Sequence, residues 1–147
     1  MMFRVALPML WVALSSSQAM AWEDPIKGEA AVYSSVCYSV QSGDLRGERL
    51  IILNSHAQHF AIYQQTGGEF GFPIWGKAEI RGNHFRFIAQ NRYGSVLEFE
   101  GTITPDYVDG HFANESPGSD NTARWQRVSA DSRFTPECPA HKPMEKR

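Results

Sequence analysis

Hydrophobic and polar residues alternate along most of the chain beyond residue 30, and the alternation is clearest between positions 83 and 114. Because successive side chains of a β-strand point to opposite faces, a period of two predicts strands with one apolar face. Turn residues interrupt it at Asn91-Arg92-Tyr93-Gly94 and at Thr104-Pro105-Asp106-Tyr107. The segment therefore predicts three consecutive antiparallel strands. Their shared apolar face carries Phe85, Phe87, Ala89, Leu97, Phe99, Ile103, Val108 and Phe112.

Weaker alternation predicts further strands on both sides of this meander. We expect them at residues 31–41, 49–54, 58–64, 70–80 and 122–128, with a loop at 66–69. Pro73 cannot donate a backbone hydrogen bond, so it requires a sheet edge or a bulge. About eight strands with short connections predict an all-β fold, a single antiparallel meander that closes into a small barrel or forms a related sandwich. Asp24-Pro25 is also typical of a helix start, so a short N-terminal helix is the alternative there.

Two adjacent strands, Phe99-x-Gly101-x-Ile103 and Val108-x-Gly110-x-Phe112, resemble the hairpins of small secreted barrels of the lipocalin-like (calycin) type. The resemblance covers about residues 94–128. The Gly-x-Trp signature that lipocalins carry near their first strand does not occur at the corresponding place in this sequence. The resemblance therefore implies a barrel and assigns no functional residue.

The first 21 residues have the three parts of a secretory signal peptide. Arg4 supplies a positive charge, an apolar run of about ten residues follows, and Ala19-Met20-Ala21 forms an A-x-A cleavage site. The run reaches half of the roughly 20 residues that a membrane-spanning helix needs, so we expect cleavage after Ala21 and no membrane span. The sequence thus predicts an exported protein, periplasmic or extracellular, with one domain at 22–138 and a flexible tail at 139–147.

The charge of the chain argues against nucleic acid and anionic membranes as partners. The 147 residues include 14 basic and 16 acidic side chains, which gives a net charge of −2, and loss of Arg4 with the signal brings the mature chain to −3. Partners that carry dense negative charge attract strongly basic proteins instead.

Both cysteines, Cys37 and Cys138, lie in the mature part of the chain. An even number of cysteines in an oxidising compartment predicts an intramolecular disulfide. That bond would join the C-terminal segment to the start of the domain. The alternatives are a reactive thiol and a metal ligand, and neither cysteine has a neighbour of the kind that those roles require.

No motif for catalysis, metal binding or cofactor binding stands out, so we predict no catalytic residue, no metal ligand and no cofactor. His56 and His59 are three positions apart, and in a strand an odd separation points side chains to opposite faces. His84 and His111 have the parity opposite to that of the phenylalanines in their strands, which predicts that both lie outside the barrel.

Glu98 and Glu100 are spaced to lie side by side on one face, as the two carboxylates of a glycosidase do. Arg86 on the neighbouring strand offers a simpler interpretation, because opposite charges across two strands stabilise a sheet. We therefore interpret these glutamates as part of a solvated outer face.

Aromatic side chains are 12% of the chain, and most of the phenylalanines have core parity. The segment 67–75 differs, since three glycines and a proline surround Phe70, Phe72 and Trp75. Aromatic side chains exposed on such a loop would contact a protein partner. The alternative is a glycine-kinked strand whose aromatics all turn inward. Asn114-Glu115-Ser116 forms a glycosylation sequon, which matters only in a host that glycosylates such sites.

These observations favour a non-enzymatic binding protein that recognises or inhibits a macromolecular partner, of unknown identity, through Phe70, Phe72 and Trp75. The first alternative is a lipocalin-like carrier of a small apolar ligand, lined by Phe85, Phe87, Phe99 and Phe112. An eight-stranded barrel either fills its interior with side chains or holds one such ligand. The second alternative is a hydrolase with an unfamiliar site, because function depends on sites more than on folds.

Overall fold

A computed structural model describes residues 26, 28–55, 58–113, 121–129 and 135–139. Nine β-strands make up most of this part of the chain, and it contains no helix. The strands are β1 (Ala30–Ser34), β2 (Cys37–Ser39), β3 (Asp44–Ser55), β4 (Gln58–Phe70), β5 (Ile74–Arg81), β6 (His84–Gln90), β7 (Val96–Ile103), β8 (Tyr107–Phe112) and β9 (Thr122–Val128).

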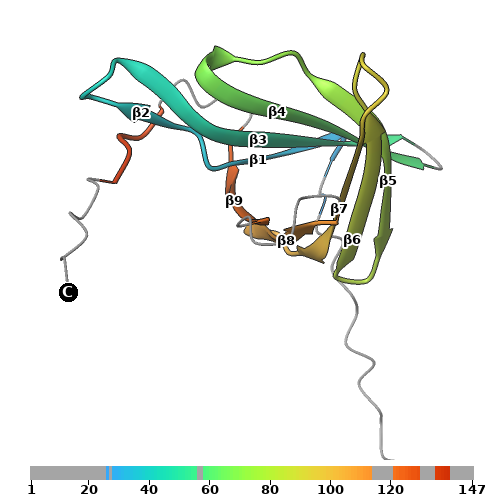
Figure 1. Ribbon diagram of the computed structural model, residues 1–147. Helices are drawn as coiled ribbons and strands as arrows, with labels where there is room; N and C mark the ends of the chain where they lie inside the picture. Colours follow the sequence, from blue (N-terminus) through green and yellow to red (C-terminus); the bar gives the residue numbers. More distant parts are fainter. Residues whose placement is uncertain (1–25, 27, 56–57, 114–120, 130–134, 140–147) are drawn as a thin grey trace, which may run out of the picture.

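The strands form one antiparallel sheet that closes on itself (Figure 1). Strands β3 to β9 pair in chain order, and β1 pairs with both β9 and β3. Eight strands thus make a barrel, while β2 pairs only with β3 among the nine strands and lies outside the closure. The predicted eight-stranded barrel is confirmed. The residues Asp24 and Pro25, on which the alternative of an N-terminal helix depended, lie outside the described residues.

Strand β4 is longer than the sequence predicts. The Gly-rich segment 66–69, expected to be a loop, continues the pairing of β4 with β3, where Gly67 lies opposite Arg46 and Gly68 opposite Leu45. Phe70 therefore ends β4 instead of starting the next strand, and β5 begins only at Ile74, after Pro73. Long-range pairing with β3 outweighs the low strand propensity of glycine here.

The predicted strand at 31–41 is interrupted at Ser35 and Val36, which separate β1 from β2. The amide of Val36 donates to Oγ of Ser34 at 3.0 Å, and the amide of Ser35 donates to the carbonyl of Glu48 at 2.9 Å. The hydroxyl of Ser34 thus takes the place of a backbone carbonyl as the acceptor for the Val36 amide. Serine side chains commonly compete with backbone groups in this way. After this break the chain leaves the barrel and runs along the start of β3 as β2 (Figure 1).

The core consists of the inward-facing side chains of the barrel, as the alternation predicts. Trp125, Phe85, Phe99, Leu50 and Ile52 are essentially inaccessible to solvent. Their removal from water is the main favourable contribution to the stability of the fold. Aromatic rings dominate this core, and they occupy its centre as one contacting cluster.

The predicted disulfide is confirmed, since Cys37 and Cys138 are bonded. Backbone hydrogen bonds extend the contact, because the amide of Tyr38 donates to Pro136 and the amide of Cys138 donates to Tyr38, at 2.7 and 2.9 Å. The C-terminal segment thereby lies along the outer edge of β2. The predicted signal peptide and its cleavage site after Ala21, most of the predicted tail at 139–147, and the sequon at Asn114 lie outside the described residues. Within the part that the structure describes, no helix has the length and apolar character needed to cross a bilayer.

Candidate functional site

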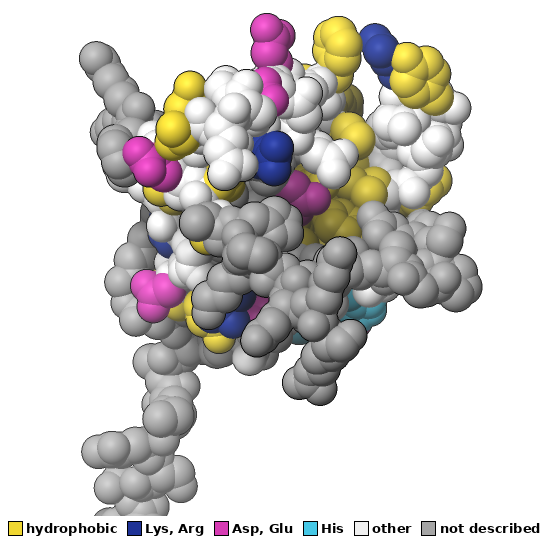
Figure 2. Space-filling view, turned by 60° about the vertical axis from the view of Figure 1, so that its left-hand side comes forward, with side chains coloured by type: hydrophobic (Ala, Val, Ile, Leu, Met, Phe, Trp, Pro, Cys, Tyr) yellow, Lys and Arg dark blue, Asp and Glu magenta, His cyan; other side chains and the backbone are white. Residues whose placement is uncertain are grey.

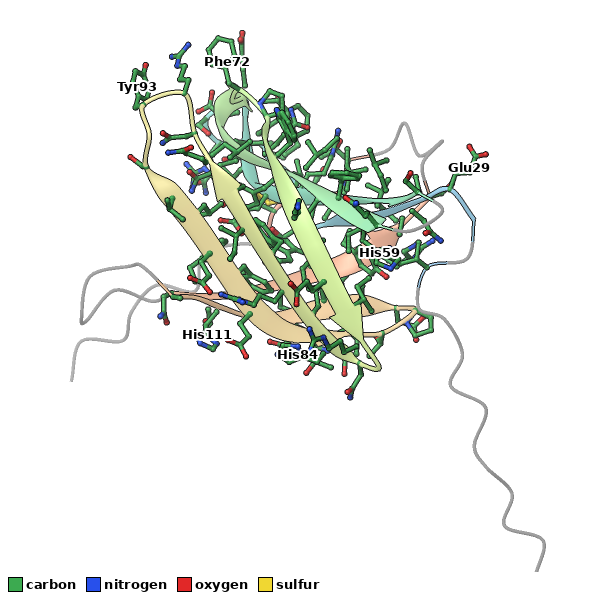
Figure 3. All side chains as sticks on the ribbon, turned by 90° about the vertical axis from the view of Figure 1, so that its right-hand side faces the viewer. Glu29, His59, Phe72, His84, Tyr93 and His111 are labelled. Carbon is green, nitrogen blue, oxygen red and sulfur yellow. A yellow bond between two sulfur atoms is a disulfide. The ribbon has the colours of Figure 1, made fainter. Side chains whose placement is uncertain are left out.

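Exposed aromatic side chains gather at one end of the barrel, where the connection between β4 and β5 lies beside the turn between β6 and β7. Figure 3 shows Phe72 and Tyr93 close together at this end. The exposed fractions are 36% for Phe70, 75% for Phe72, 69% for Trp75 and 77% for Tyr93. We call these four residues the aromatic rim. Three of them are the residues that the sequence predicts as a partner contact.

A tight reversal after β4 turns the rim residues outward. The amide of Gly71 donates to the carbonyl of Gln65 at 2.8 Å, so the chain folds back on the end of β4. A Cβ at Gly71 would lie 2.9 Å from the same carbonyl oxygen, which is too close for any other residue without a shift. Trp75 then pairs with Ile62 on β4 and points to the outer face. The alternative prediction, in which all these aromatics turn inward, is wrong because Phe72 and Trp75 are largely exposed.

Asn91 holds the β6–β7 turn in one conformation. Its side-chain Oδ1 accepts hydrogen bonds from the amides of Tyr93 and Ser95, at 2.9 and 3.0 Å. Gly94 completes the turn with φ of 85°, a value that favours glycine. The ring of Tyr93 is therefore presented by a turn with fixed geometry although it is exposed.

Two arginines stack on the aromatic rim. The guanidinium of Arg92 lies 4.5 Å from the ring centre of Phe72 and 4.8 Å from that of Tyr93. The guanidinium of Arg49, on β3, lies 4.1 Å from the ring centre of Phe70. Each contact falls within the range of a cation–π interaction. Arg92 thus links the β6–β7 turn to the β4–β5 connection, and Arg49 on β3 contacts the last residue of β4.

A pocket of about 590 Å³ opens between these two connections. This volume is within the range of sites that bind small molecules or the anchoring side chains of a partner. It is lined by Phe72, Pro73, Ile74, Trp75, Gln90, Asn91, Arg92 and Tyr93. In the space-filling view, hydrophobic side chains flank a basic one at the top of the molecule (Figure 2).

Sequence reasoning missed Arg92 and Tyr93 as members of the site. It used both only as turn residues, and their place beside Phe72 results from the pairing of β5 with β6. The sequence nevertheless contained a hint for Tyr93, because a tyrosine in a tight turn between two strands cannot reach the core and is expected to be exposed.

The four phenylalanines predicted to line a ligand site lie in the interior and pack against one another. Phe85, Phe87, Phe99 and Phe112 are at most 5% exposed. The ring centres of Phe87 and Phe99 are 5.8 Å apart, and those of Phe99 and Phe112 are 5.2 Å apart. The pockets found over the described residues are not lined by these rings. A ligand between them would have to displace side chains that already fill the space.

The carboxylate of Glu48 forms hydrogen bonds with two side chains of the core. Glu48 accepts a hydrogen bond from the hydroxyl of Tyr63 on Oε1, at 2.6 Å, and one from the indole Nε1 of Trp125 on Oε2, at 3.0 Å. Both donors belong to buried side chains, so the carboxylate satisfies two polar groups that have lost contact with water. These two hydrogen bonds give Glu48 a structural role in the core.

The outer face of β6, β7 and β8 carries paired charges. Arg86 donates to Glu98, as the cross-strand interpretation predicts, and His84 lies 2.9 Å from Glu100. The hydrogen bond from His84 holds the pKa of Glu100 below its ordinary value, with partial opposition from desolvation and further help from the charges of His84, Arg86 and His111. The hydrogen bond and charge of Glu98 raise the pKa of Arg86.

His84 and His111 lie outside the barrel as predicted (Figure 3). His56 lies outside the described residues, whereas His59 is on β4. Among the described side chains, no group of three or more His, Cys, Asp or Glu residues is arranged to hold a metal ion.

Comparisons of the chain with models of protein families, with curated proteins and with solved structures gave no match.

Proposed function

We propose that this protein is an exported, non-enzymatic binding protein that recognises a macromolecular partner through the aromatic rim. The observation that carries the proposal is the group of exposed rings at one end of the barrel, around a pocket of about 590 Å³. Large aromatic side chains with arginine among them are typical of the residues that contribute most to protein–protein affinity.

The scaffold supports this role because it presents the rim without much freedom of movement. Gly71 and Asn91 fix the two connections through backbone hydrogen bonds, and Arg92 joins them by its contacts with Phe72 and Tyr93. A surface that is already ordered loses less conformational entropy on binding. Exposing aromatic rings to water is unfavourable for the free protein. A partner that covers the aromatic rim would explain why several exposed rings lie together at one end of the barrel.

Export is part of the proposal. The Cys37–Cys138 disulfide is compatible with an oxidising compartment, and residues 1–21 have the order of parts expected of a signal peptide. N-terminal sequencing of the protein recovered from the exported fraction of its host tests this directly. We expect the mature chain to begin at Trp22. An intact N-terminus on the recovered protein would contradict export through a cleaved signal.

The carrier of an apolar ligand draws less support, because the four phenylalanines assigned to its cavity pack against each other. A hydrolase draws least support. Charged groups on the outer sheet face that could serve in hydrolysis form cross-strand pairs instead, as in Arg86 with Glu98 and Arg124 with Asp109.

The role of the rim is tested by comparing the mature protein with Phe72→Ala, Trp75→Ala and Tyr93→Ala as bait for exported proteins of the host. Tyr38→Ala is the matched control, since Tyr38 is an aromatic residue that is 41% exposed and lies on β2, outside the rim. We expect one protein to be captured in stoichiometric amount. Its affinity, measured by calorimetry with the purified partner, should fall at least about tenfold in the rim variants. Equal affinity for wild type and all three rim variants would remove the rim from the interface.

A further inference from the structure

Three arginines on the outer sheet face of this barrel pair with carboxylates of the same chain. Arg81 lies 3.4 Å from Glu79, Arg124 lies 3.1 Å from Asp109, and Arg86 bonds to Glu98. These pairs lie along strands β5 to β9, and each is made by neighbouring residues or strands. Their positive charge is therefore already balanced within the sheet.

Arg49 and Arg92 differ from these arginines, because each is stacked on a rim aromatic and forms no ion pair within the described part of the chain. Glu69, next to Phe70 in the chain, makes no ion pair with either of them. The Nε atom of Arg49 is buried and has no hydrogen-bond partner among the described residues.

We infer that the partner presents an acidic peptide segment to the rim, with carboxylates that pair with Arg92 and Arg49 and an apolar residue that enters the pocket between Phe72 and Tyr93. The inference rests on the proposed function and adds the chemistry of the partner. Stacking on a ring leaves the edge of a guanidinium free, and that edge matches a carboxylate with two parallel hydrogen bonds.

The distribution of charge supports an acidic segment over other occupants. The mature chain has a net charge of −3, so most of its surface disfavours an acidic partner, whereas the two guanidinium groups stacked on the rim pair with no carboxylate among the described residues. This difference directs such a partner to one end of the barrel. The rings have already restrained the side chain of Arg92, which reduces the entropy that pairing would cost.

The experiment is a titration of the ¹⁵N-labelled mature protein with two short peptides, followed by NMR. Both contain Trp-Pro at the centre, and one has two glutamates on each side where the other has glutamines. We expect the glutamate peptide to shift the indole signal of Trp75, the amide of Tyr93 and the side-chain Nε of Arg92. Its affinity should exceed that of the glutamine peptide by about tenfold and should weaken as salt rises.

Three variants test whether the preference for the glutamate peptide depends on the stacked arginines. Arg92→Gln and Arg49→Gln should each lower affinity for the glutamate peptide by about fivefold to tenfold, with little effect on the glutamine peptide. Arg81→Gln is the matched control, because Arg81 is highly exposed and paired with Glu79, and it should change neither. Equal unfolding midpoints of the variants by urea titration will show that all of them are folded.

The outcomes separate the inference from the function on which it rests. Equal binding of both peptides at the rim would overturn the acidic-segment inference and leave the rim as a binding surface. Absence of shifts at millimolar concentrations of either peptide would overturn the inference, whereas the capture experiment with rim variants would still decide the proposed function. Tighter binding of polygalacturonate than of the glutamate peptide would replace the peptide with an anionic polysaccharide. Sedimentation as a dimer that Trp75→Ala dissociates would replace it with a second copy of this chain.

Discussion

At the residue scale, Glu48 shows how a charged side chain can stabilise an aromatic core. The hydroxyl of Tyr63 and the indole N–H of Trp125 belong to buried side chains, which are 6% and 0% exposed. One carboxylate accepts from both, which joins β3 to β4 and to β9. Hydrogen bonds to a charged acceptor are stronger than those between neutral groups.

Removal of this carboxylate should therefore be costly. Glu48→Ala removes the acceptor of both hydrogen bonds, and we expect a loss of about 2 to 4 kcal/mol in the free energy of unfolding, measured by urea titration. In Tyr63→Phe one of the two donors is absent, so adding Glu48→Ala to that background should cost less than it does in the wild type. Equal costs in both backgrounds would mean that the hydroxyl of Tyr63 does not depend on Glu48.

Glu100 provides a second prediction at this scale, on pH dependence. The hydrogen bond from His84 lowers the pKa of Glu100 in the folded protein. For a carboxyl group with a lowered folded pKa, the stabilising contribution is complete above the ordinary pKa and is lost as the pH falls through the folded value. In His84→Ala, which removes the donor, the pKa of Glu100 should rise towards its ordinary value, as a carboxyl ¹³C NMR titration would show. Arg81→Gln serves as control, and an unchanged pKa in the histidine variant would remove His84 as the cause.

At the scale of elements, β7 and β8 approach closely because two glycines face each other. Gly101 pairs with Gly110, and a Cβ on Gly101 would lie 2.1 Å from the carbonyl oxygen of Asp109. A Cβ on Gly110 would lie 2.7 Å from Cζ of Phe99. The sequence gives these glycines inward parity on adjacent strands, and the structure shows that the absence of a side chain at Gly110 leaves room for the ring of Phe99.

Alanine at position 101 should accordingly destabilise the barrel. The added methyl group meets backbone atoms that cannot rotate away, so we expect a loss of about 1 to 3 kcal/mol and a lower thermal midpoint by circular dichroism. Gly67→Ala is the matched control on a strand, because a Cβ there meets nothing within 4 Å. Similar midpoints for the two variants would show that the β7–β8 contact adapts without cost.

The elements also show what sequence reasoning could and could not recover. Strands β6 to β8 were predicted within a few residues, because their alternation is strong and local turns bound them, and β9 was predicted at the same bounds from weaker alternation. The end of β4 was missed, since its glycines are strand residues only through pairing with β3. Phe70, Phe72 and Trp75 were identified from their unusual surroundings. The contribution of Arg92 and Arg49 depends on which strands become neighbours, and no spacing along the chain contains that information.

At the scale of the whole molecule, the disulfide joins two segments that the barrel itself does not hold. Strand β2 lies outside the closure, and the C-terminal segment contacts it through the backbone of Tyr38 and the bond between Cys37 and Cys138. The bond closes a loop in which the two cysteines are 101 positions apart, so nearly the whole domain lies within it. Its main effect in the chain-entropy description is to restrict the unfolded chain.

The double variant Cys37→Ser/Cys138→Ser should therefore keep the barrel but lose stability. For a loop of about 100 residues the chain-entropy description gives about 4 to 5 kcal/mol, which urea titration of wild type and variant would measure. We expect a native near-ultraviolet circular dichroism spectrum below the transition, because Trp125 and the rings around it lie within the core of the closed strands. Loss of that spectrum in the absence of urea would show that the bond is needed to form the barrel. An unchanged midpoint, with free thiols in the wild-type protein, would show that the bond does not form in the folded protein.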